Sequence, residues 1–215
     1  MHRVDDTIAG PVRSGARQLL LDTAVRYTEE RRWEVLAGAW LEPGPAGTPV
    51  CSCAAASCPA PGAHPAEPDW AAEVCCTAAA VQRAWNERPR ASILLPTGRA
   101  FDVVEVSESA GFHALARLER QGLPLGPVLC TPSWRMAFFV LPGSSARTHA
   151  FLERMGWPAI AADVVVRGQG DWVVAPPTCT LEGCAQWARR PSPVDPWLPD
   201  CGEVLGALAY ACARA

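Results

Sequence analysis

The chain has 215 residues, a formal net charge of −3 at pH 7 and 49% hydrophobic residues, with nine tryptophans among them. This length and apolar content predict one domain with a sizeable core and exclude a largely disordered chain. The 19 basic residues are all arginines and are interleaved with acids, so no basic run marks a nucleic-acid surface. No signal peptide is evident, and no apolar run approaches the roughly 18 residues of a membrane helix. We therefore expect a cytoplasmic protein without a membrane partner.

Helices and short strands alternate in the first part of the chain. Residues 1–13 are predicted to be a flexible leader, and residues 14–215 a single domain. Ser14 is a residue type that caps helices, and an apolar stripe at helical spacing follows it. The elements expected here are a helix from Ser14 to Arg32, a strand from Trp33 to Trp40, a Pro-Gly segment from Glu42 to Pro49, and a helix capped by Thr77.

Three strand pairs are predicted in the second part, with single helices between them. The expected pairs are Ser92–Leu95 with Phe101–Val106, Val128–Thr131 with Met136–Leu141, and Ile160–Arg167 with Trp172–Ala175. The expected helices run from Ser109 to Gly122, from Ser144 to Gly156, and from Asp200 to Arg214. This order predicts an α+β fold, with a mainly antiparallel sheet and flanking helices.

The most specific local pattern is the loop of residues 51–65, which we call the knot loop. Three thiols and an imidazole, those of Cys51, Cys53, Cys58 and His64, fall within fourteen residues rich in Pro, Gly and Ala. Zn²⁺ takes four such ligands at tetrahedral angles, so the loop is interpreted as a closed, structural zinc site inserted at one edge of the fold. The close spacing of Cys51 and Cys53 also predicts a backbone amide directed at a thiolate. The alternatives are a loop of free thiols or disulfide bonds.

The other cysteines and the other histidines are given simpler roles. The remaining cysteines lie among apolar residues, and most are interpreted as small buried hydrophobes. His2, His113 and His149 lie away from any acid or thiol motif and are expected at the surface or in satisfied helix positions.

Several motifs occur together in an order that resembles a known family. They are Trp33 and Trp40, the Cys-Ser-Cys loop ending Pro-Gly-Ala-His-Pro, Trp85 before Pro89, Leu95–Gly98, Thr131–Ser133, and Gly170–Thr178. Over roughly residues 17–212 the chain is similar to the bifunctional DNA primase/polymerase N-terminal domain of the archaeo-eukaryotic primase superfamily. The resemblance implies an RRM-like core, here as a stand-alone domain with degenerate catalytic motifs.

The resemblance also implies a site for two divalent metals, Mg²⁺ or Mn²⁺, held by an Asp-x-Asp strand and a later acid. The first acid falls on Glu105, the second on Ser107 and the third on Asp163. Ser107 cannot supply a charged ligand. Asp102 is expected on the strand face opposite Glu105, and Glu108 could help only through a bulge.

The turn that binds nucleotide phosphates in the family falls on residues 131–139. Ser133 and Arg135 are present there, but Met136 stands where the family has a histidine. A methionine carries no charge and donates no hydrogen bond to phosphate. The resemblance therefore implies a nucleotide-binding turn that has lost one of its polar groups.

Three functions follow from these observations. The first is a primase/polymerase-like protein with impaired catalysis, which binds a nucleotide, a nucleic acid or a protein partner in a regulatory or accessory role. The second is an active DNA-directed nucleotidyltransferase in which Asp102, Glu105, Glu108 and Asp163 share the two metals. The third is a zinc-stabilised protein-interaction module that uses exposed tryptophans, although Trp33, Trp40, Trp85 and Trp157 are at positions that ordinarily complete a core.

Overall fold

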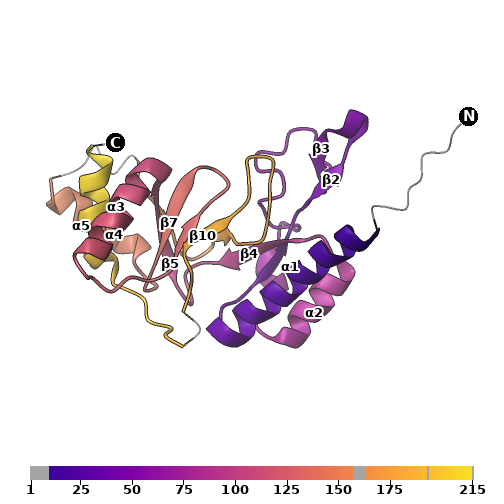
Figure 1. The fold of residues 1–215 in the computed structure, drawn as a ribbon, viewed down its shortest axis with the longest axis horizontal. Helices are drawn as coiled ribbons and strands as arrows, with labels where there is room; N and C mark the ends of the chain where they lie inside the picture. The colour runs from indigo at the N-terminus through magenta and orange to yellow at the C-terminus, as the bar shows by residue number, and fades with distance from the viewer. Residues whose placement is uncertain (1–9, 157–162, 193, 215) are drawn as a thin grey trace, which may run out of the picture.

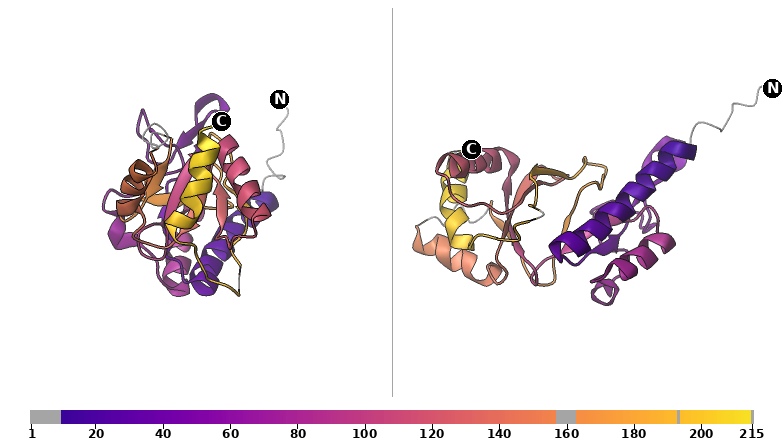
Figure 2. Two further views of the ribbon diagram at one scale, coloured as in Figure 1. Left: turned by 90° about the vertical axis from the view of Figure 1, so that its left-hand side faces the viewer. Right: turned by 60° about the horizontal axis from the view of Figure 1, so that its bottom comes forward.

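The computed structural model describes residues 10–156, 163–192 and 194–214. The two larger antiparallel sheets, each with its own layer of helices, lie side by side along the long axis (Figures 1 and 2). The predicted α+β class is thereby confirmed. Within the described ranges, no helix has both the length and the apolar character needed to cross a membrane.

The first half of the molecule contains a three-stranded sheet covered by two helices. The sheet has the order β1-β4-β9, formed by Leu36–Gly38, Ser92–Pro96 and Trp172–Val174. The covering helices are α1 (Gly10–Arg31) and α2 (Ala78–Glu87). Thr77 caps α2 as predicted, because its side chain accepts a hydrogen bond from the N–H of Ala80. Trp85 lies on the buried face of α2 and is only 2% exposed.

The second half contains a five-stranded sheet that positions the candidate site. Its order is β10-β6-β7-β5-β8, formed by Gln186–Arg189, Val128–Cys130, Arg135–Val140, Asp102–Ser107 and Val165–Arg167. The helices of this half are α3 (Glu108–Arg120), α4 (Ser145–Arg154) and α5 (Cys201–Cys212). Asp200 begins α5 with a capping box, in agreement with the predicted start of that helix.

The two faces of the five-stranded sheet have different partners. Val104 and Val106 of β5 pack in one cluster with residues of α3 and α5. Val103, on the alternate face, joins the core of the first half together with Phe139 and Trp33. The Trp33 and Phe139 rings are stacked with their centroids 5.3 Å apart. This second face therefore joins the halves, and Glu105 lies on it.

The structure corrects two of the three predicted strand pairs. β4 and β5 do not pair with each other, and neither do β8 and β9. Each connection carries the chain from one sheet to the other, and the two crossovers contact one another. Thr97 donates a side-chain hydrogen bond to the carbonyl oxygen of Gly168, 2.5 Å away. Gly98 has a φ of +99°, and a Cβ there would lie 2.3 Å from the Cα of Gln169, so this close approach requires glycine.

Other boundaries also differ from those predicted. α1 begins at Gly10, inside the expected leader; residues 1–9 lie outside the described ranges. The Pro-Gly segment forms a hairpin of β2 (Leu41–Pro43) and β3 (Pro49–Cys51) around a short 3₁₀ turn, Pro45–Gly47. A second 3₁₀ turn covers Trp70–Glu73, and β10 lies outside the three predicted strand pairs.

Candidate functional site

The knot loop brings its four predicted ligands together. The thiol sulfurs of Cys51, Cys53 and Cys58 and a ring nitrogen of His64 all lie within 4.8 Å of one another. Both ends of the loop are anchored in sheet structure: Cys51 closes β3 opposite Leu41 in the hairpin, and the chain after His64 forms a bridge to β1. The loop therefore lies at the edge of the three-stranded sheet, as predicted.

Hydrogen bonds around the knot loop orient its ligands. The N–H of Gly62 donates to the Cys51 sulfur at 3.4 Å, which is the predicted amide-to-thiolate contact. Nδ1 of His64 lies 2.6 Å from the carbonyl oxygen of Pro65. Because a carbonyl only accepts, Nδ1 carries the proton and Nε2 keeps its lone pair. Nε2 is also the ring nitrogen that faces the Cys51 sulfur, at 3.3 Å.

The thiols of the knot loop differ in acidity. A hydrogen bond from the backbone of Ala55, with smaller contributions from Cys51, His64 and Cys58, lowers the pKa of Cys53 to about 7. Burial raises the pKa of Cys58 to about 11. A metal ion binds thiolates and so favours deprotonation of the whole set. The donor set, its spacing and its supporting hydrogen bonds fit a bound metal ion.

A second cluster, which we call the acid site, is formed by Glu105, Arg135, Asp163 and Arg167. Glu105 is only 3% exposed and projects from β5, between the strands that carry the two arginines. Arg167 of β8 donates two hydrogen bonds to the Glu105 carboxylate, from Nε to Oε1 at 2.6 Å and from Nη2 to Oε2 at 3.3 Å, so the pair is bidentate. Burial lowers the pKa of Arg167, but hydrogen bonding and charge from Glu105 outweigh it and leave the pKa raised.

Arg135 of β7 lies between the two acids. Its Nε is 3.8 Å from Oε2 of Glu105, and its Nη1 is 3.3 Å from Oδ1 of Asp163. It also donates to the backbone carbonyls of both acids. The other carboxylate oxygen of Asp163 accepts a hydrogen bond from the N–H of Ser107 at 3.4 Å. The two predicted acids therefore lie in one cluster, with arginine side chains against both carboxylates.

The Cys212 thiol of α5 completes the surroundings of Asp163. Its sulfur lies 3.8 Å from Oδ2 of Asp163. Burial, followed by the charge and hydrogen bond of Asp163, raises the pKa of Cys212 to about 11. This thiol is therefore protonated at neutral pH and donates to the carboxylate.

Met136 does not lie where a phosphate-binding residue would be expected. Met136 is opposite Val106 in the pairing of β7 with β5 and is fully buried beneath α3. A Cβ added to Gly111 of α3 would lie 2.5 Å from the Cβ of Met136. Glu105 and Arg135 project from the other face of the sheet, because side chains alternate along a strand. The register of β7 thus separates Met136 from the acid site.

The remaining candidate acids do not converge either. Asp102 is buried at the opposite end of β5 from Ser107, and alternation directs it away from the Glu105 face, as predicted. Glu108 begins α3, beyond the end of the strand. Among the described residues, the knot loop is the single group of three or more side chains arranged to hold a metal ion. The carboxylates of the acid site do not form one.

A cleft of about 310 Å³ connects the acid site with the knot loop. Its walls include Glu105, Ser133 and Arg167 on the sheet side and Pro59 and Pro61 of the knot loop. Trp172 of β9 also lines the cleft, and its indole N–H donates to the carbonyl oxygen of Ala63 at 3.0 Å. The shape of the cleft therefore depends directly on the conformation of the knot loop.

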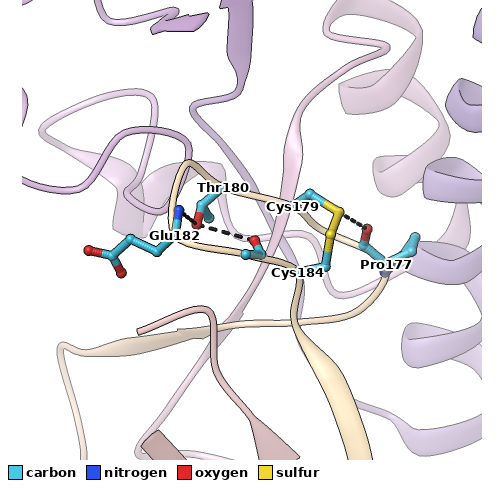
Figure 3. The surroundings of a disulfide bond; sticks show 6 residues. Pro177, Cys179, Thr180, Glu182 and Cys184 are labelled. Atoms are coloured by element: carbon cyan, nitrogen blue, oxygen red, sulfur yellow. Dashed lines mark hydrogen bonds between the residues drawn. A yellow bond between two sulfur atoms is a disulfide. The ribbon is translucent and has the colours of Figure 1, made fainter. Parts of the chain in front are cut away.

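A disulfide loop forms the remaining wall of the cleft. Cys179 and Cys184 are bonded, and the tip between them, Thr180–Glu182, lines the cleft (Figure 3). Both cysteines are exposed, which corrects their interpretation as buried hydrophobes. Cys75 and Cys201 are buried free thiols, as predicted, but Cys76 is exposed.

Sequence reasoning did not find Arg167, Cys212 or the disulfide loop. Arg167 lies four residues after Asp163 in a predicted strand, which is a weak indication at most. Its role depends on the pairing of β8 with β5, in which Arg167 is opposite Val103. Of the predicted histidines, His113 is exposed, whereas His2 and the side chain of His149 are outside what is described.

The comparisons with known proteins agree with this arrangement at the level of the family. The sequence matches the family described as bifunctional DNA primase/polymerase, N-terminal, over residues 24–200. That range covers most of the chain, which therefore belongs to this family. No curated protein and no solved structure matches it.

Proposed function

We propose that this primase/polymerase family member binds a nucleotide or nucleic-acid strand in the cleft and has impaired polymerase chemistry. The observation that carries the proposal is the bidentate pair between Glu105 and Arg167. Two-metal phosphoryl transfer requires carboxylate oxygens that are available to hard cations. Both carboxylate oxygens of the buried Glu105 already accept hydrogen bonds from the Arg167 guanidinium. A divalent cation placed there would lie beside the positive charges of Arg167 and Arg135.

The residue at the second acid position supports the same conclusion. Ser107 offers no charge, and its backbone N–H instead fixes a carboxylate oxygen of Asp163. Breaking a buried ion pair to free Glu105 for a metal costs roughly 3 to 5 kcal/mol when the pair is fully desolvated. Metal binding by Glu105 and Asp163 would therefore compete with the ion pairs that these acids form with Arg167 and Arg135.

We further propose that the metal of the knot loop is Zn²⁺ and that its role is structural. Three thiolates and one imidazole are the soft and borderline ligands that Zn²⁺ takes in closed tetrahedral sites. With four protein ligands, no coordination position is left for a substrate. The ion would hold Pro59, Pro61 and Ala63 in place as one wall of the cleft.

Primer synthesis and primer extension, with Mg²⁺ or Mn²⁺, test the impaired chemistry. The purified protein is compared with a Glu105→Ala, Asp163→Ala double variant and with Arg120→Ala, a control on the exposed face of α3. We expect no incorporation above background by any of the three. Incorporation that disappears only in the double variant would instead assign an active nucleotidyltransferase.

Nucleotide binding is measured separately, so that inactivity is not mistaken for lack of a ligand. A fluorescent deoxynucleoside triphosphate is titrated with the zinc-loaded protein, with and without millimolar Mg²⁺. We expect binding that Mg²⁺ strengthens by less than about twofold, because the site's own arginines occupy the carboxylates. No binding in either buffer would leave a protein-interaction role as the better proposal.

A further inference from the structure

A second groove, on the other side of the disulfide loop, has no role in the proposed chemistry. It measures about 600 Å³ and lies between α1 and the chain from Pro176 to Pro191. Pro177 and Cys184, at the base of the disulfide loop, line this groove, whereas the tip of the loop lines the cleft. In Figure 3, Pro177 and Cys184 lie at the end of the loop away from Thr180 and Glu182.

The groove carries arginines without carboxylate partners. Arg26 and Arg190 are both exposed, and among the described residues no carboxylate lies within 4.0 Å of either guanidinium. Both charges act on Tyr27, which also lines the groove: burial raises the pKa of Tyr27 to about 12, and the hydrogen bond with Trp187 and the charges of Arg26 and Arg190 oppose that shift. Glu30 is the acid among the lining residues.

A third cation, Arg31, lies beneath the groove. It is 7% exposed and donates to the backbone carbonyls of Ser192 and Asp195, and the Asp195 carboxylate opposes the lowering of its pKa by burial. Its Nε is buried without a hydrogen-bond acceptor among the described residues. Arg26 and Arg190, with Glu30 as the acid in the lining, leave the rim of the groove with a net positive charge, although the whole chain has a net charge of −3.

The floor of the groove is apolar, and its aromatic rings are used internally. Leu19 is 49% exposed at its edge, beside Pro176 and Pro177. Trp187 donates its indole N–H to the hydroxyl of Tyr27 at 3.1 Å, and Tyr27 is only 6% exposed. Single-stranded nucleic acids are held largely by bases stacked on open aromatic faces, whereas Tyr27 is buried and the partly buried Trp187 ring packs against Tyr27 and Phe139. A peptide with one apolar side chain between two acidic residues fits this groove better, because the apolar side chain matches the apolar floor and the acids match the arginines at the rim.

We propose that the groove between α1 and the disulfide-loop base is a docking site for an acidic peptide segment of a partner protein, with one large apolar side chain as its anchor. The anchor lies on Leu19 and the prolines, and its flanking carboxylates pair with Arg26 and Arg190. The site is distinct from the cleft, so a partner held there and a nucleotide bound in the cleft do not compete for the same residues.

The test uses the zinc-loaded protein of 215 residues and a fluorescein-labelled peptide of glutamates around one central phenylalanine, with binding followed by fluorescence anisotropy. We expect an Arg26→Glu, Arg190→Glu double variant to weaken binding by at least about tenfold, since two favourable charge contacts become repulsive. Arg120→Glu, which reverses an exposed charge on α3, should leave binding within about twofold. Circular dichroism confirms that each variant folds.

Two further arms separate this site from its alternatives. A Leu19→Ser variant, or a peptide with alanine in place of phenylalanine, should each weaken binding several-fold while keeping its salt dependence. The proposal is overturned if a peptide with glutamines in place of glutamates binds equally well, or if no peptide binds. It is also overturned if an oligothymidylate binds more tightly than the peptide and loses affinity in the same double variant, which would assign the groove to a nucleic-acid strand.

Discussion

The knot loop and the acid site both bring together side chains of types that bind metals. The two clusters differ in what these side chains contact. In the knot loop, three sulfurs and one ring nitrogen face each other within 4.8 Å. In the acid site, Glu105 and Asp163 are each met by an arginine. The comparison teaches that carboxylates at the family's positions can be paired with arginines of the same protein, and this pairing is the basis of the proposed loss of metal chemistry.

The largest effect is expected from removing one ligand of the knot loop. Cys51→Ser should lower the bound zinc to well under one equivalent and unfold the loop, since structural zinc binding contributes on the order of 10 kcal/mol in small domains. Metal content and thermal unfolding are measured beside Cys76→Ser, which changes an exposed thiol outside the loop. A Cys51→Ser protein that keeps a full equivalent of zinc would contradict the assignment.

The next largest effect is expected from removing Arg167, which compensates the charge of the buried Glu105 carboxylate. Arg167→Ala leaves a carboxylate with 3% exposure without its bidentate partner. We expect a loss of about 2 to 3 kcal/mol in urea unfolding, less than the roughly 3 to 5 kcal/mol of a fully buried pair, because Arg167 is partly exposed. An Arg167→Ala, Glu105→Gln protein should recover most of that loss. If the single variant is as stable as the parent, the pair does not hold the site together.

A substitution at Met136 tests whether the residue type expected from the family or the strand face on which it lies decides its role. Met136→His restores the family's residue type, but on the buried face beneath α3. We expect about 2 kcal/mol of destabilisation from a buried polar group and no gain in nucleotide affinity. Thermal unfolding and the fluorescent nucleotide titration are the two measurements. Tighter nucleotide binding by Met136→His would show that this side chain reaches the cleft.

The smallest effect on the fold is a difference in thiol reactivity. After chelation of the metal, Cys53 should react with iodoacetamide at pH 7.5 because it is exposed, whereas the partly buried Cys212, with a pKa of about 11, should not. Peptide mass spectrometry measures both sites. The raised pKa of Cys212 also means that its contribution to stability is complete below pH 9 and is lost as the pH rises toward 11. Equal labelling of the two thiols at pH 7.5 would contradict this contrast.

The sequence predicted the parts of the site whose residues are close neighbours in the chain. The knot loop follows from the spacing of its ligands in a segment rich in Pro, Gly and Ala, and the capped starts of α2 and α5 follow from Thr77 and Asp200. The family register correctly placed Glu105 and Asp163 in one cluster. It was less informative about Met136, because one position along β7 decides which face of the sheet a side chain joins.

By itself, then, the sequence determined the local features of this protein: the ligand set of the knot loop, the helix caps, the alternation along β5 and the family. The tertiary structure alone decided which strands pair and what surrounds each acid. Arg167 and Glu105 are 62 residues apart, and the two crossovers looked like hairpins because local turn residues do not specify the strand's partner. The reason is physical: turns and loops depend on neighbouring residues, whereas ion pairs across a sheet depend on register and packing over the whole chain.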